Sequence, residues 1–121
     1  MSIAALAAAA PGLEDHGATA STTVAALPRA DPERGRKLLA QYQCGSCHTI
    51  PGVPSAGGQQ APSLRSFGQR SYIAGRVVNR PELLERWIAQ PQSLVPGTAM
   101  PSMGVSPADA RHMAAYLLEL R

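Results

Sequence analysis

The stretch QYQCGSCHTI, residues 41–50, contains both cysteines of the chain, Cys44 and Cys47, and places His48 directly after the second one. Two cysteines permit one disulfide, half of a metal site, one redox pair or one covalent attachment. The spacing C-x-x-C-H brings two thiols and an imidazole into one short turn. A fold built around this turn has to serve a chemistry that needs all three groups together.

Three kinds of site use such a motif. A thioredoxin-like redox pair requires a βαβ setting, and no segment alternates apolar and polar residues over four or more positions between turn signals. A zinc site requires four ligands, but the other histidines are His16 and His112, and there is no second C-x-x-C. Attachment of a c-type haem requires one thiol for each vinyl group, and His48 then lies under the iron as an axial ligand. We therefore expect one covalently attached haem c, with iron as its metal.

A second axial ligand, commonly methionine, is expected from a distant loop. Met100 lies in the sequence PGTAMP, 52 residues after His48, where prolines stiffen a loop that has no helical period. Met103 lacks this bracket, and His112 and Met113 fall within an expected helix, where Met113 is a core residue. The sequence thus predicts His48 and Met100 as the two iron ligands.

Length and composition limit the remaining classes. A chain of 121 residues corresponds to one small domain with a modest core. It has five aromatic residues, so a large apolar cofactor would help to fill the interior. The net charge is +3, but the arginines are scattered among acidic residues, which argues against a nucleic-acid-binding surface. No stretch approaches about 18 apolar residues, so the sequence contains no candidate membrane span.

Residues 1–30 differ from the rest, because they are rich in Ala, Ser and Thr. Residues 3–10 resemble the apolar part of a secretory signal, and Ala-Thr-Ala at 18–20 resembles a cleavage site, but a positively charged start is missing. A signal and a flexible lead-in both remain open. In either case the folded domain is predicted over residues 31–121.

Local signals predict three helices joined by long loops, and therefore an all-α fold class. Asp31 and Ser106 are N-cap residues, each followed by a proline at the first helical position. Pro91 ends the middle helix. The expected helices cover residues 31–43, 81–90 and 106–121, residues 49–68 and 92–105 are loops, and residues 71–78 are a short helix or an irregular turn.

Four motifs give the chain a family resemblance over about residues 31–121. They are GRKLLAQYQCGSCH at the front, L-x-x-W-I in the middle, PGTAMP, and AAYLLEL at the end. With them the chain resembles the small bacterial monohaem c-type cytochromes with His/Met ligation. RSYIAG and PQ-x-x-x-PGT-x-MP also make it similar to the cytochrome domains associated with haem–copper oxidases. The resemblance implies a cytochrome c fold, with three to four helices and long loops wrapped around one covalently attached haem.

The resemblance also implies roles for single residues. The carbonyl of Pro62 would accept a hydrogen bond from His48 and fix its tautomer. Trp87 would donate its indole N–H to a haem propionate, and further candidates for the propionates are Arg70, Tyr72 and Arg76. The expected cofactor-binding residues are thus Cys44, Cys47, His48, Pro62, Arg70, Tyr72, Trp87 and Met100.

Two backbone features follow from the same resemblance. The first and last helices would cross closely at Gly35, with Tyr116 packing near the crossing. Family members usually have glycine before the proline that holds the axial histidine, whereas Ala61 stands at this position here. The resemblance therefore does not predict the backbone angles at Ala61.

The implied function is that of a single-electron carrier and not of an enzyme. Its partners would be redox proteins, such as an oxidase, a dehydrogenase or a bc1-type complex, in the bacterial periplasm. The carrier would be a monomer, and a membrane tether upstream of this sequence stays open. Partners would dock at a haem edge beside the cysteines, with a rim of Gly45, Ser46, Ile50 and the loop around Val53. Two alternatives also stay open: a haem enzyme or ligand-binding haem protein with a labile sixth ligand, and a haem-free thiol oxidoreductase.

Overall fold

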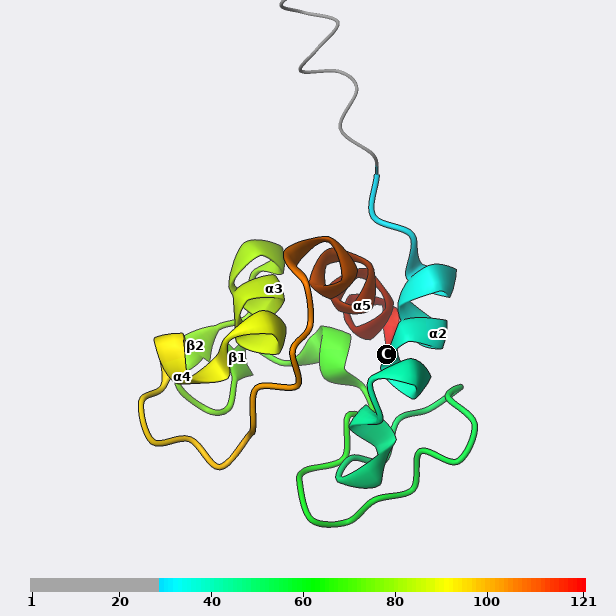
Figure 1. The fold of residues 1–121 in the computed structure, drawn as a ribbon, viewed down its shortest axis with the longest axis horizontal. Helices are drawn as coiled ribbons and strands as arrows, with labels where there is room; N and C mark the ends of the chain where they lie inside the picture. Colours follow the sequence, from blue (N-terminus) through cyan, green and yellow to red (C-terminus); the bar gives the residue numbers. More distant parts are fainter. Residues whose placement is uncertain (1–28) are drawn as a thin grey trace, which may run out of the picture.

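The computed structural model of the chain describes residues 29–121. All but the last two residues of the predicted N-terminal segment, residues 1–30, lie outside this part. The described chain is mainly helical with long connections (Figure 1), which confirms the all-α fold class. Its elements are helices α2 (Pro32–Gln41), α3 (Pro81–Ala89), α4 (Pro91–Leu94) and α5 (Pro107–Glu119), the 3-10 turns η1 (Cys44–Ser46) and η2 (Phe67–Gln69), and the strands β1 (Tyr72–Ile73) and β2 (Val77–Val78).

Helix α2 begins as its sequence predicts. The side chain of Asp31 accepts hydrogen bonds from the backbone N–H groups of Glu33 and Arg34, which have no partner inside the helix. The helix ends at Gln41, slightly earlier than expected, because Gln43 adopts a left-handed backbone with φ of 61°. This residue turns the chain directly into η1, which begins with Cys44.

Helices α2 and α5 cross at Gly35, as predicted. A Cβ atom at this position would overlap the backbone carbonyl of His112, so only glycine permits the approach. The two helices lie side by side in Figure 1. Tyr116 extends from α5 to the loop that follows His48, where its hydroxyl donates a hydrogen bond to the Pro51 carbonyl at 2.5 Å.

Helices α3 and α5 supply much of the core. Ser106 caps α5 by accepting a hydrogen bond from the Asp109 N–H at 3.1 Å. The buried face of α5 consists of Ala110, Met113, Ala114 and Leu117, and that of α3 consists of Leu84, Trp87 and Ile88. These faces pack together at the helical period that the sequence displays.

Two short elements differ from the expectations. Residues 71–78, expected as a short helix or irregular turn, form an antiparallel hairpin in which Tyr72 pairs with Val78 and Ile73 with Val77. Each strand has two residues, too few for alternation to be visible. Pro91 ends α3 but also occupies the first position of α4, a place that proline favours.

No helix within residues 29–121 is long and apolar enough to cross a membrane.

Candidate functional site

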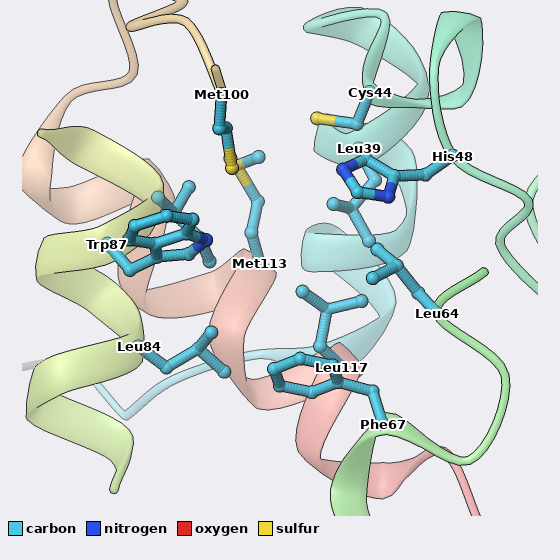
Figure 2. Close-up of a pocket in the computed structure, with 11 residues that line it drawn as sticks. Leu39, Cys44, His48, Leu64, Phe67, Leu84, Trp87, Met100, Met113 and Leu117 are labelled. Carbon is cyan, nitrogen blue, oxygen red and sulfur yellow. The ribbon is translucent and has the colours of Figure 1, made fainter. Parts of the chain in front are cut away.

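An apolar pocket lies between α2, α3 and α5, with the cysteine turn at one side and the loop that precedes α5 at the other (Figure 2). A larger cavity of about 390 Å³ adjoins this pocket and shares with it the lining residues His48, Leu64, Phe67, Trp87 and Met100. This volume lies within the range of small-molecule and cofactor sites. The remaining lining residues of the first pocket are Leu39, Cys44, Leu84, Ile88, Met113 and Leu117.

Both cysteines border this space as free thiols. Cys44 is half-buried and lines the inner pocket, and Cys47 is exposed and lines the larger cavity. Burial raises the pKa of the Cys44 thiol above its ordinary value.

The loop after His48 folds back over the cysteine turn. Gly58 donates its N–H to the Gly45 carbonyl and Ala61 donates to the Cys47 carbonyl, both at 3.0 Å. A Cβ atom at Gly58 would overlap the backbone of Ser46 and Cys47, so the two chain segments touch without side chains between them. Backbone contacts therefore hold the cysteine turn in place.

The imidazole of His48 is oriented by the same loop. Its Nδ1 lies 2.6 Å from the carbonyl oxygen of Pro62, which is the predicted contact. Since a carbonyl can only accept, Nδ1 carries the proton and Nε2 keeps the lone pair that a metal would use. Ala61 is not among the residues with positive φ, so alanine meets the backbone requirement here.

Met100 faces His48 across the pocket and lines both spaces (Figure 2). Its carbonyl accepts a hydrogen bond from the side-chain amide of Gln92 at 2.8 Å. Met103 is 43 % exposed and lines neither space. Met113 is fully buried and lines the inner pocket from α5. Of the two methionines weighed for the ligand role, the structure thus brings Met100 to the pocket.

His112, considered as another ligand, is engaged elsewhere. Its Nδ1 accepts a hydrogen bond from the backbone N–H of Asp31 at 2.8 Å. It joins the start of α2 to α5 and lines neither the pocket nor the cavity.

The propionate candidates divide into two groups. Trp87 lines both spaces, and Arg70 lines the larger cavity, where its guanidinium donates to the Ser63 carbonyl and lies 5.4 Å from the Phe67 ring centre. Tyr72 and Arg76 line neither space. Tyr72 is 54 % exposed, because the alternation of β1 turns its neighbour Ile73 inward instead.

Several lining residues were not predicted, and two of them, Leu64 and Phe67, line both spaces. Leu64 and Phe67 lie in and after the long loop, where no period marks an inward face. The Leu64 N–H donates to the Thr49 carbonyl at 2.8 Å, and this bond folds the loop so that both side chains reach the pocket. The available signal was compositional: Phe67 is the only phenylalanine of the chain.

The expected docking rim beside the cysteines needs correction. The side chains of Ile50 and Val53 are 2 % and 6 % exposed, so these two belong to the core. Ser46 and, in the loop around Val53, Pro54 and Ser55 are exposed, so this part of the rim stays a prediction. The chain turns inward because the Ile50 N–H donates to the Ala56 carbonyl and closes a compact loop over both side chains.

The chemistry of the lining fits a haem. Two thiols, one imidazole with a fixed tautomer and one thioether surround a space whose other walls are mostly aliphatic and aromatic. Residues 29–121 contain no group of three His, Cys, Asp or Glu side chains that could hold a bare metal ion. An iron porphyrin brings four of its own ligands, so two protein ligands suffice.

Comparisons with known proteins agree with this reading. Residues 32–121 match the Cytochrome c family. The chain is 38 % identical over 89 residues to cytochrome c oxidase subunit 2 of Alkalihalophilus pseudofirmus, covering 73 % of this chain and 25 % of that protein. It is 30 % identical over 108 residues to cytochrome c of Ginkgo biloba, covering 78 % of this chain and 93 % of that one. The chain thus spans about a quarter of the length of the oxidase subunit.

A solved structure shows the same fold. Cytochrome c2 from Rhodobacter sphaeroides matches with a TM-score of 0.57 at 19 % identity, over 76 % of this chain and 97 % of that one. The chain belongs to the cytochrome c family. Its cofactor is a covalently attached haem c with iron, and members of the family are electron carriers.

Proposed function

We propose that this chain is a single-electron carrier in which thioether bonds from Cys44 and Cys47 hold the haem, and His48 and Met100 ligate its iron. The observation that carries the proposal is the pocket itself. His48, with Nδ1 bonded to Pro62, faces Met100 across an apolar space that both cysteines border. When bound, haem c supplies an iron that accepts and releases one electron.

The protein's part in attachment is to place two thiols at the pocket edge. There each thiol would form one thioether with a vinyl group of the haem, the thiol proton going to the neighbouring vinyl carbon. No oxidant is consumed. The Gly58 and Ala61 hydrogen bonds fix the turn between Cys44 and Cys47 for this reaction.

The other residues tune the site without making or breaking bonds. Pro62 holds the His48 proton at Nδ1 and raises the basicity of the ligating nitrogen. The thioether of Met100 and the apolar lining favour the less charged, reduced state. If His48 and Met100 both hold the iron, no position is left open to oxygen or peroxide, as a carrier requires and the haem-enzyme alternative does not.

A respiratory partner, such as a haem–copper oxidase, is the acceptor that we propose. The similarity to an oxidase subunit 2 supports it. A dehydrogenase or a bc1-type complex would supply the electrons. We place the protein in the bacterial periplasm, since c-type haem is attached outside the cytoplasm. We propose that it acts there as a monomer.

Intact mass and visible spectroscopy test the proposal on protein matured with a haem-attachment system. We expect the mass of one haem, and a ferric absorption band near the red edge that reports methionine coordination. Met100→Ala should abolish this band, whereas the control Met103→Ala should retain it. A colourless product would contradict the assignment and favour the thiol oxidoreductase. A ferric protein that lacks the band at neutral pH would also contradict it and favour the haem enzyme or ligand-binding haem protein.

A further inference from the structure

The β1–β2 hairpin has one face turned into the protein and one turned outward. On the inner face Ile73 pairs with Val77, and Ile73 is 1 % exposed. On the outer face Tyr72 pairs with Val78, and both are largely exposed. β2 ends at Val78, and a turn follows in which the Arg80 N–H donates to the Val78 carbonyl at 2.9 Å. The outer pair, together with the exposed arginines on either side of β2, is here called the hairpin patch and consists of Tyr72, Arg76, Val78 and Arg80.

The apolar content of the hairpin patch is unusual for this protein. Among residues 29–121 the large exposed apolar side chains are Tyr72, Val78 and Met103, and the first two are direct cross-strand neighbours. An aromatic residue framed by arginines is typical of the energetic centre of protein interfaces, where tyrosine and arginine are enriched. A solvated surface has no need of this combination.

The charge of the patch selects the chemistry of its partner. Neither Arg76 nor Arg80 makes a side-chain hydrogen bond or an ion pair with any residue of 29–121. Residues 34–81 contain seven Arg or Lys residues and no Asp or Glu. The next acid along the chain is Glu82, exposed in the first turn of α3, and it makes no ion pair with Arg80. The patch therefore keeps an excess of positive charge, and a complementary surface is acidic.

The hairpin patch is also continuous with the haem pocket. Ile73 and Ala74 line the larger cavity, so the inner side of the hairpin forms part of its wall. Ala74 and Gly75 both adopt positive φ, which gives the tight turn that brings the hairpin back over the cavity. A protein bound to the outer face would therefore sit one chain layer away from the cofactor.

We propose that the hairpin patch is the docking surface for an acidic redox protein, a proposal that rests on the electron-carrier function. A second copy of this chain does not fit, because a symmetric contact would place Arg76 and Arg80 against the same residues. The hairpin patch is distinct from the rim beside the cysteines, where Ile50 and Val53 are buried but Ser46, Pro54 and Ser55 are exposed.

The test compares two double variants of the haem-loaded protein that carry the same net charge. Arg76→Gln with Arg80→Gln removes two charges from the patch, and Arg34→Gln with Lys37→Gln removes two from the exposed side of α2. The probe is a reduced blue-copper protein of net negative charge, with one of net positive charge in parallel. Stopped-flow spectroscopy follows transfer of one electron from Cu(I) to the ferric haem, and amide NMR shifts report the contact surface.

We expect the patch variant to slow transfer from the acidic probe about tenfold at low salt, and the α2 control about twofold. The difference should fade at high salt. Tyr72→Ser should weaken the complex about fivefold without changing its salt dependence. The shifted amides should lie in residues 70–80.

Equal slowing in both double variants, or no slowing in either, would overturn the docking surface, as would amide shifts confined to residues 44–58. Selective loss of binding to phosphatidylcholine–phosphatidylserine vesicles, with transfer unchanged, would assign the patch to a membrane instead. Reversible reduction of the wild-type protein by ascorbate separates the two proposals. If that reduction fails, the electron-carrier function is wrong, whatever the variants do.

Discussion

The two walls of the pocket are held in different ways. On the His48 wall, backbone hydrogen bonds join residues 45–50 to residues 56–64, and glycines allow these two loop segments to touch. On the Met100 wall, residues 96–105 rely largely on side chains, such as the amide of Gln92 and the hydroxyl of Ser102, which donates to the Ala89 carbonyl at 3.4 Å. One proposed ligand thus lies among backbone hydrogen bonds, here called the rigid wall, and the other lies in a segment held mainly by side chains, here called the methionine loop.

The largest effect should come from crowding the rigid wall. Gly58→Ala places a Cβ atom against the backbone of Ser46 and Cys47, which cannot move aside, so we expect a loss of about 2 to 3 kcal/mol in the free energy of unfolding. Chemical denaturation measures it. The control is the neighbouring Gly57→Ala, whose added Cβ meets no atom within 4 Å. If both variants lose the same stability, the close approach at Gly58 is not what holds the rigid wall.

A smaller effect should follow from cutting the tie between the rigid wall and α5. Tyr116→Phe removes the hydroxyl that donates to the Pro51 carbonyl, at about 1 kcal/mol of stability. Tyr72→Phe serves as the control, because its exposed hydroxyl makes no hydrogen bond within residues 29–121. A shift in denaturation midpoint that is equal in the two variants would show that the tie contributes nothing.

The opening of the methionine loop should be sensitive to Gln92. Gln92→Leu removes the donor to the Met100 carbonyl, at about 0.5 kcal/mol for a partly solvated bond. We expect the alkaline pH at which the methionine absorption band disappears to fall by about half a unit. Gln69→Leu, on the exposed end of η2, is the control and should leave the band's pH dependence unchanged. An unaltered midpoint in the Gln92 variant would mean that other contacts keep this loop closed.

The smallest effect concerns two tyrosines, Tyr42 and Tyr116, and the stability of the fold at alkaline pH. A hydrogen bond to the Asp109 carboxylate raises the pKa of Tyr42, and burial raises the pKa of Tyr116. Because each folded-state pKa lies above the unfolded value of about 10, this stabilisation is complete below that pH and is lost as pH rises through the folded values. Thermal unfolding between neutral and strongly alkaline pH should show the decline. Tyr42→Phe should flatten it, and a wild-type midpoint that rises with pH above 10 would contradict the linkage.

The helices could be predicted from sequence, as could the convergence of His48 and Met100 on one pocket, because each has a local signal. Asp31 and Ser106 cap their helices as their residue types require. The C-x-x-C-H turn and the methionine loop are recognisable from spacing alone. The contact between His48 and Pro62 was also predicted, but only through the family resemblance.

What was missed depends on contacts between distant segments. The two-residue strands have no visible period, and Ala74 hides a turn that usually shows glycine or asparagine at its first position. Burial of Ile50 and Val53 results from a loop closing on itself, which composition does not reveal. Tyr72 was expected near a propionate because nothing in the sequence says which strand face is outermost.

Helix α2 determines where a segment that precedes Asp31 meets the folded domain. Its ten residues separate Asp31 from the cysteine turn by about 15 Å along the axis. The hydrogen bond from Asp31 to His112 fastens the far end of that rod to α5. A fusion or anchor introduced ahead of Asp31 should therefore load a part of the fold that is attached to α5 and lies away from the cysteine turn. The domain could then rotate as a whole about that linker without distortion of the haem site.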